Sequence, residues 1–131
     1  MPVDRSRDSH EAGSSTTELV LLMPVVLLLI MLIVQFGLWL HAQQIAAAAA
    51  QEGLVAAQAE FGTSAAGRDR ATSFLIEAGG LRQVRVEAER DATSVRVEVA
   101  GVTPAVIPGM ALAVGAVAQG PVERFVGETS R

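Results

Sequence analysis

A long apolar stretch near the start of the chain constrains the fold more than any other feature. No charged residue occurs from Leu19 to Leu40. This stretch holds about 22 residues, and roughly 20 helical residues at 1.5 Å each cross the hydrocarbon core of a bilayer. Each central Leu, Ile, Val or Phe favours insertion by about 0.3–0.6 kcal/mol, and their sum outweighs Gln35, Gly37 and Pro24. The sequence therefore predicts a membrane-spanning helix.

Two other interpretations of this stretch stay open. The first is a buried core helix, but such helices are usually amphipathic, and 131 residues cannot enclose a helix that is apolar on every face. The second is a cleaved secretory signal, because Ala46-Ala47-Ala48 offers the small residues of a cleavage site. The apolar run is longer than the usual ~7–15 residues of a signal, and Glu18 stands where a basic residue is expected. A spanning helix fits these residues best.

The polar residues before the stretch indicate how the helix is oriented. Residues 1–13 show no periodicity and predict a disordered leader. Arg5 and Arg7 lie in this leader, and no Lys or Arg follows until Arg68. Because positive residues stay on the cytoplasmic side, we expect the N-terminus in the cytoplasm and the C-terminal domain outside it.

Helix-forming residues continue beyond the apolar stretch. From His41 to Phe61 only Gly53 interrupts them, which predicts one helix from about residue 15 to 61, with Gly62 as its stop. Ser14 to Thr17 are suitable N-cap residues for this helix. Glu18 would then lie in the first turn, where a carboxylate stabilises the positive end of the helix dipole.

Small residues recur on one face of the second half of this helix. They are Ala42, Ala46, Ala50, Gly53 and Ala57. Such a face permits another element to approach the backbone closely. The chain's own sheet and a helix of a neighbouring subunit are both suitable occupants, and we favour the sheet.

Residues 62–131 predict a small α+β domain. Thr63 to Gly67 is typical of a linker, and Arg68 to Ala78 predicts a short amphipathic helix that ends at Gly79-Gly80. Apolar residues then alternate with charged ones in two segments that flank Asp91, which predicts a β-hairpin with one apolar face. The apolar positions are Val84, Val86 and Ala88, followed by Val95, Val97 and Val99.

The last part of the chain predicts the rest of the sheet. Met110 to Ala118 is a third strand, Gly120-Pro121 a turn, and Val122 to Val126 either a short edge strand or a segment that covers the sheet. The expected fold is therefore α+β: a long N-terminal transmembrane helix that continues into an extracytoplasmic domain with a short helix and a three- to four-stranded antiparallel sheet.

The charged and polar residues exclude several classes of function. The net charge is −4 and no basic cluster is present, so nucleic acid is not an expected partner. The chain has no cysteine, and the spacing of His10 and His41 suits no metal. Acids and arginines interleave on the hairpin as on a solvated sheet surface. We expect no cofactor, no metal, no small-molecule substrate and no enzymatic activity.

Several motifs together resemble those of the type IV pilin superfamily. Gly13 ends a short leader, Ser14 follows it, and Glu18 lies five positions after the glycine, directly against the apolar helix. Within the superfamily the chain is most similar to TadE-like pseudopilins of tight-adherence (Tad, or Flp) pilus systems. The segments that carry this likeness are Glu18-Leu-Val-Leu-Leu-Met-Pro24, Gln35-Phe-Gly37, the Ala-rich Gln44 to Ala57 with Gln51-Glu-Gly53, and Gly120-Pro-Val-Glu-Arg-Phe125.

The resemblance implies a processing site and an assembly residue. A membrane prepilin peptidase would cut between Gly13 and Ser14, and Glu18 would assist assembly. The domains would then be a cleaved cytoplasmic leader (1–13), a transmembrane and projecting helix (14–61) and an extracytoplasmic domain (62–131). The leader is rich in acids where prepilin leaders are more basic. Leu19 replaces the aromatic residue common in Flp pilins, which argues against a major pilin.

The resemblance also implies a function. It is that of a minor pseudopilin in the cytoplasmic (inner) membrane, which acts by anchoring and by association in pilus biogenesis. Its partners would be the membrane, the prepilin peptidase, other pilins or pseudopilins, and the inner-membrane pilus platform. The alternative is a single-pass anchored binding domain that undergoes no processing.

Overall fold

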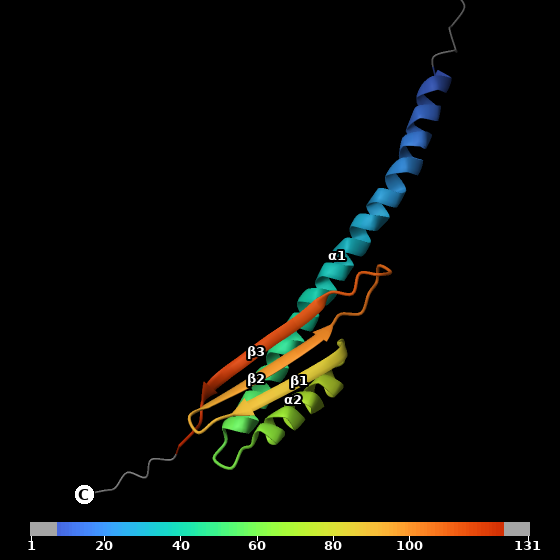
Figure 1. Ribbon diagram of the computed structural model, residues 1–131. Helices are drawn as coiled ribbons and strands as arrows, with labels where there is room; N and C mark the ends of the chain where they lie inside the picture. The colour runs from blue at the N-terminus through green and yellow to red at the C-terminus, as the bar shows by residue number, and fades with distance from the viewer. Residues whose placement is uncertain (1–7, 125–131) are drawn as a thin grey trace, which may run out of the picture.

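One long helix forms the axis of the molecule. The computed structural model describes the backbone of residues 8–124 and the side chains of residues 16–124. Helix α1 (Asp8–Gln58) has 51 residues, which is about 75 Å at 1.5 Å per residue. Figure 1 shows that α1 extends far beyond the sheet, which packs only along its C-terminal part. The chain thus has a long projecting helix and a small domain at one end of it.

Both ends of α1 differ from the prediction. The helix begins at Asp8, inside the expected leader, and ends at Gln58. Extending an existing helix adds one hydrogen bond for each residue fixed and avoids the cost of nucleation, so the polar residues before Glu18 continue the helix instead of starting it. Residues 1–7 of the predicted leader lie outside the described residues.

The Arg90 side chain caps the C-terminal end of α1. Its Nη1 atom donates to the carbonyl oxygens of Ala57, Ala59 and Gly62. These groups lie at the negative end of the helix dipole, where a cation is stabilising. A Cβ atom at Gly62 would lie 2.5 Å from the carbonyl oxygen of Ala56, so this tight turn also requires a glycine.

Helix α2 (Ser64–Ala78) begins earlier than the sequence suggested. The predicted linker from Thr63 to Gly67 is wrong, because Thr63 is the N-cap and its Oγ1 accepts a hydrogen bond from the Ala66 amide at 3.0 Å. The helix ends, as predicted, at two glycines with positive φ, Gly79 and Gly80.

Three antiparallel strands form the sheet in the order β1-β2-β3. They are β1 (Arg82–Arg90), β2 (Ser94–Val102) and β3 (Ala113–Pro121). The predicted hairpin is confirmed, and its inner face carries the buried Val95, Val97 and Val99. Val84 is the exception, since it is 41% exposed. The register shifts between Arg82 and Arg85, where Gln83 has a φ of 50°, and Val84 lies within this irregular part of the strand.

The third strand is also confirmed, with different ends. It starts at Ala113 and continues through the expected turn at Gly120-Pro121, where Pro121 pairs with Ser94. A proline is compatible with this position because it is the last residue of an edge strand. Val122 to Arg124 form no strand, and the remaining two residues of the predicted edge strand lie outside the described residues.

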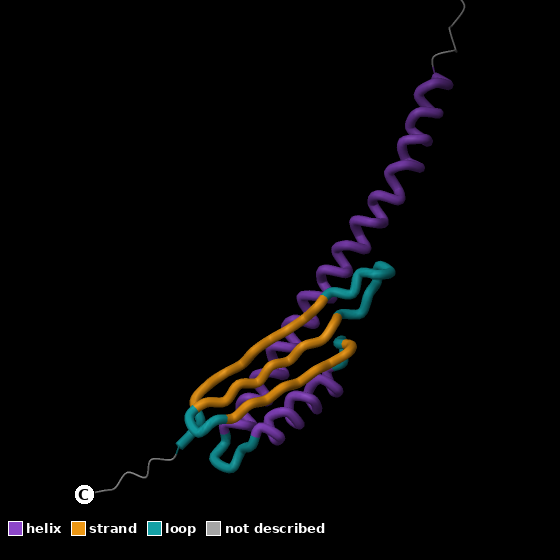
Figure 2. Tube along the Cα trace, in the orientation of Figure 1, coloured by secondary structure: helices purple, strands orange, loops and turns teal. Residues whose placement is uncertain are grey.

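Both helices cover the same face of the sheet. Helix α1 packs under β2 and β3, and α2 packs against α1 and β1 (Figure 2). The core between these layers consists of Ala42, Ile45, Ala46, Ala49, Ala50, Leu54, Ala57, Ala71, Leu75, Ala88, Val95, Val97, Val99, Val114 and Ala118. Alanine and glycine at the helix positions allow the layers to lie close together, and the valines of the strands fill the space between them.

Candidate functional site

The first half of α1 presents a continuous apolar surface. Leu21 and Ile33 are each 71% exposed, and most apolar side chains from Leu19 to Leu40 are also exposed. A core helix would bury them, so the buried-core interpretation is wrong. Within residues 16–124, α1 is the one helix long and apolar enough to cross a membrane.

The secretory-signal interpretation conflicts with the core of the domain. A cut at Ala46 to Ala48 would detach Ala42, Ile45 and Ala46, which are all buried between α1 and the sheet. The same cut would remove Gln35 and Gln43. The Gln35 side chain donates to the Pro104 carbonyl in the segment before β3, and the Gln43 side chain donates to the Gly115 carbonyl in β3. Residues on both sides of the supposed cleavage site therefore belong to the folded domain.

The predicted processing and assembly residues lie on one continuous helix. Gly13 and Ser14 are in the helical backbone of α1, and the Glu18 side chain is exposed. Glu18 follows the first helical residue by about ten positions, whereas the stabilising effect of a helix dipole is confined to the first turn. The predicted first-turn position of Glu18 is therefore wrong for the uncut chain. A cut after Gly13 would make Glu18 the fifth residue and restore that position.

A series of polar side chains on α1 binds the β3 side of the domain. Trp39 Nε1 donates to the Ala113 carbonyl at 3.1 Å, Gln43 Nε2 to the Gly115 carbonyl at 2.6 Å, and Gln58 Nε2 to the Pro121 carbonyl at 2.8 Å. These bonds satisfy three carbonyl groups on the outer edge of β3, the side on which another strand could otherwise pair. Sequence reasoning did not identify this role, although glutamines in an apolar and alanine-rich helix are a visible signal.

Gln35 makes the most buried of these contacts. It is 1% exposed although it lies within the apolar stretch. Its Nε2 donates to the Pro104 carbonyl at 3.3 Å, and its Oε1 accepts from the Val106 amide at 2.8 Å. One amide side chain thus satisfies a carbonyl and an N–H of the loop between β2 and β3.

The small-residue face of α1 is occupied within the chain. Ala42, Ala46, Ala50 and Ala57 are at most 1% exposed, and they pack in the core. A Cβ atom at Gly53 would lie 2.8 Å from the Gly67 carbonyl oxygen of α2 and 3.1 Å from Cγ1 of Val97. The structure therefore places the chain's own sheet and α2 on this face, and no neighbouring helix can occupy it in this fold.

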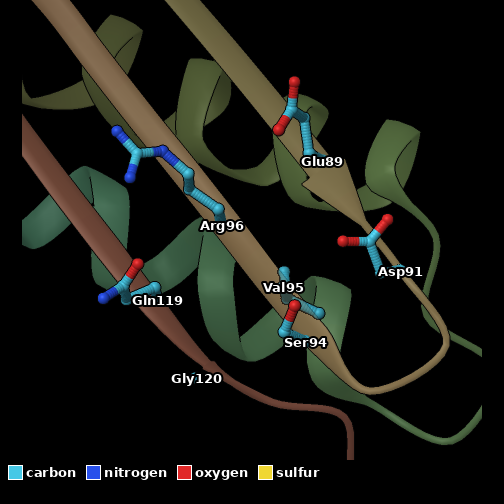
Figure 3. A pocket seen from close by; sticks show the side chains of 7 residues that line it. All are labelled: Glu89, Asp91, Ser94, Val95, Arg96, Gln119 and Gly120. Carbon is cyan, nitrogen blue, oxygen red and sulfur yellow. The ribbon is translucent and has the colours of Figure 1, made fainter.

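The outer face of the sheet is charged and solvated. Figure 3 shows side chains from all three strands around an open depression, with Glu89 on β1, Arg96 on β2 and Gln119 on β3. Arg96 pairs with Glu98 at 3.2 Å, and both side chains are about half exposed. Surface ion pairs of this kind contribute about 0–1 kcal/mol. This face suits solubility and weak contacts.

One family model matches a segment of this chain, and that segment lies within α1. Residues 13–54 match the family model described as TadE-like protein. Comparisons with curated proteins and with solved structures find no match. The matched segment includes Gly13, Glu18, Gln35 and most of the small-residue face, and it stops before α2 and the sheet. Over this segment the chain is similar to TadE-like proteins, which is consistent with a TadE-like protein of the Tad pilus system.

Proposed function

We propose that this protein is a minor pseudopilin of a Tad/Flp-type pilus assembly and secretion system. The observation that carries the proposal is the TadE-like match over residues 13–54, which includes Gly13, Glu18 and the apolar surface of α1. The protein would anchor in the cytoplasmic membrane and act by association with other pilins and with the membrane platform, not by catalysis. The exposed apolar surface supports this proposal because it suits both lipid and the helices of partner subunits.

The topology follows from the arginines that flank the helix. Only Arg5 and Arg7 precede it, and the next basic residue is Arg68, so we expect the N-terminus in the cytoplasm and the sheet outside. A reporter that is active only outside the cytoplasm should be active when fused after Arg131. The same reporter fused before Met1 is the control and should be inactive. The opposite pattern, or release of the protein without membrane extraction, would contradict this topology.

The experiment that tests the function is determination of the mature N-terminus. In cells with a working pilus machine the protein should begin with Ser-Ser-Thr-Thr-Glu, because the prepilin peptidase cuts after Gly13. Glycine is about 1 kcal/mol less favourable than alanine within a helix, so Gly13 weakens α1 at the proposed cut, and we expect the peptidase to reach the backbone there.

Gly13→Leu should leave the precursor uncut, because leucine both strengthens the helix and adds a bulky side chain at the cut. Gly37→Leu is the matched control, since no atom lies within 4 Å of a Cβ placed there, and it should be processed normally. An intact leader on the wild-type protein would support the alternative, an unprocessed single-pass binding domain. A start at Ala47 to Ala49 would instead indicate a secretory signal.

A further inference from the structure

The loop between β2 and β3 is unusually apolar for a loop at the surface. No charged residue occurs between Glu98 and Glu123. Within this segment, residues 103–112 connect the two strands, and we call them the β2–β3 loop. Val106 is 39% exposed and Met110 is 37% exposed. The loop thus presents apolar side chains where a loop in water usually presents polar ones.

The loop has a defined conformation. The Met110 amide donates to the Ile107 carbonyl at 3.0 Å across Pro108 and Gly109, and Gly109 has a φ of 81°. Proline and a glycine with positive φ at these positions are typical of a type II turn. At the base of the loop, the Thr103 amide donates to the Leu112 carbonyl at 2.9 Å, and the Leu112 amide donates to Thr103 Oγ1 at 3.2 Å.

The loop lies beside the membrane-spanning part of α1. Figures 1 and 2 show it at the end of the sheet that faces the N-terminal half of the helix. Gln35 binds the Pro104 carbonyl and the Val106 amide, and Trp39 binds the Ala113 carbonyl just after the loop. Gln35 precedes the end of the apolar stretch at Leu40 by about one and a half helical turns.

The depth of the loop follows from the length of the helix. The rise from Glu18 to Gln35 is about 26 Å at 1.5 Å per residue, and the hydrocarbon core is about 30 Å thick. With the Glu18 carboxylate at one boundary, Gln35 lies about 4 Å inside the other boundary. A tilt of the helix would place it deeper, because the rise along the membrane normal is then smaller. The loop held by Gln35 is therefore at the level of the lipid.

The backbone of the loop is suited to this depth. Irregular backbone near hydrocarbon is tolerated only where its N–H and C=O groups have partners. The Gln35 side chain satisfies two such groups, the bonds at the base and at the turn satisfy others, and Pro104 and Pro108 have no N–H group. The interfacial position of Trp39 next to the loop is also typical of a membrane boundary.

We propose that the β2–β3 loop inserts into the outer leaflet of the bilayer, with Val106, Ile107 and Met110 in contact with lipid. The loop is then a second membrane anchor, which fixes the height and the rotation of the sheet above the membrane. This inference rests on the proposed membrane span of α1 and is independent of the role in pilus assembly. Lipid is the expected occupant because the loop is continuous with the lipid-facing surface of α1 and lies at its depth.

The test uses single cysteines, because the chain has none of its own. Met110→Cys, Ala92→Cys and Leu28→Cys are labelled with an environment-sensitive fluorophore in the full chain. Each is reconstituted into lipid nanodiscs that carry nitroxide-labelled phospholipids. Ala92 is an exposed residue in the β1–β2 turn, at the opposite end of the sheet, and Leu28 is an exposed residue near the middle of the apolar stretch.

We expect nitroxide near the headgroups to quench the label at position 110 several-fold more strongly than the label at position 92. Aqueous iodide should show the reverse order. Val106→Cys labels a second site in the loop and should behave like Met110→Cys. Agreement between the two sites would show that the result is not caused by a local effect of one substitution. The single tryptophan, Trp39, reports whether the sheet is still docked on α1 in each variant.

The other outcomes overturn the proposal in distinguishable ways. Strong quenching at position 28 with equal behaviour at positions 110 and 92 would leave the span intact and place the loop in water. Protection of position 110 from both quenchers would indicate that protein, and not lipid, covers the loop. Absence of quenching at position 28 would remove the span and with it the insertion of the loop.

Discussion

Replacing Glu18 with alanine is expected to abolish the recovery of pilin partners while membrane insertion and processing remain normal. Glu18 is the only formal charge between Glu11 and Glu52, and its side chain is exposed next to the apolar surface of α1. A carboxylate at the edge of hydrocarbon is costly without a partner, and acids in such positions generally pair. This residue therefore requires a cation when the protein is assembled.

The cation that processing would create lies at the correct spacing. A cut after Gly13 gives Ser14 a positively charged amine, and residues four apart lie on the same side of a helix, so Glu18 can meet this amine on its own chain or on an adjacent one. If Glu18 only stabilised the start of the helix, its loss would cost about 0.3–1 kcal/mol and assembly would continue. In the uncut chain even this effect is absent, because the helix begins at Asp8.

The measurement is co-purification of pilin partners together with a processing assay. Glu52→Ala is the matched control, because it removes an acid from the same helix. The Glu52 carboxylate pairs with Arg70 at 2.8 Å, and both side chains are more than 40% exposed. Such a pair contributes about 0.2–1 kcal/mol, so this variant should recover its partners. If processed Glu18→Ala protein recovers its partners at the wild-type level, Glu18 has no role in assembly and is an ordinary residue of the helix surface.

The sequence was sufficient for the parts of the fold that depend on local patterns. Apolar alternation at Val95, Val97 and Val99 predicted the inner face of β2, because side chains of a strand alternate between its two faces. The same reasoning predicted an apolar inner position for Val84, which is 41% exposed. The irregularity there is at Gln83, whose positive φ has no sequence signal, since glutamine is not a residue that favours this conformation. The predicted linker that begins at Thr63 is wrong because small and polar residues are as typical of a linker as of a capped helix start, and Thr63 is the N-cap of α2.

In the candidate site, too, some residues could be identified from local sequence patterns and others could not. Gly13 and Glu18 are visible in the sequence because they lie at a fixed spacing beside an apolar stretch. Gln35 was visible only as a polar residue in that stretch, since its partners are Pro104 and Val106, about 70 residues later in the chain. Contacts between residues so far apart have no local pattern. The proposed membrane position of the β2–β3 loop depends on the same two contacts of Gln35.

Replacing Gly53 with leucine is expected to destabilise the domain strongly. At this residue α1 and α2 approach each other with almost no side-chain atoms between them. A Cβ atom at Gly53 would lie 2.8 Å from the Gly67 carbonyl oxygen, and one at Gly67 would lie 2.8 Å from Cβ of Ala57. The nearest neighbour of Gly53 is thus a backbone atom of another helix, which cannot move without shifting the whole of α2.

The expected size of the effect follows from overpacking. Extra carbon atoms in a well-packed core cost about 1–3 kcal/mol or more, and a domain of this size has a total stability of about 4–10 kcal/mol. Even Gly53→Ala should be destabilising, although alanine favours a helix over glycine by about 1 kcal/mol. The larger leucine should cost about 3 kcal/mol or more, which is a large fraction of that stability.

Denaturation of the detergent-solubilised full chain, followed by the fluorescence of Trp39, measures this effect, because the Trp39 indole is hydrogen-bonded to β3. Gly37→Leu is the control, since a Cβ at Gly37 has no atom within 4 Å and lies outside the α1–α2 contact. We expect the wild type and Gly37→Leu to unfold cooperatively at similar denaturant concentrations and Gly53→Leu to unfold at a much lower concentration. A cooperative transition for Gly53→Leu at the wild-type midpoint would mean that α2 does not pack on α1 as described, because the contact at Gly53 leaves no space for a leucine side chain.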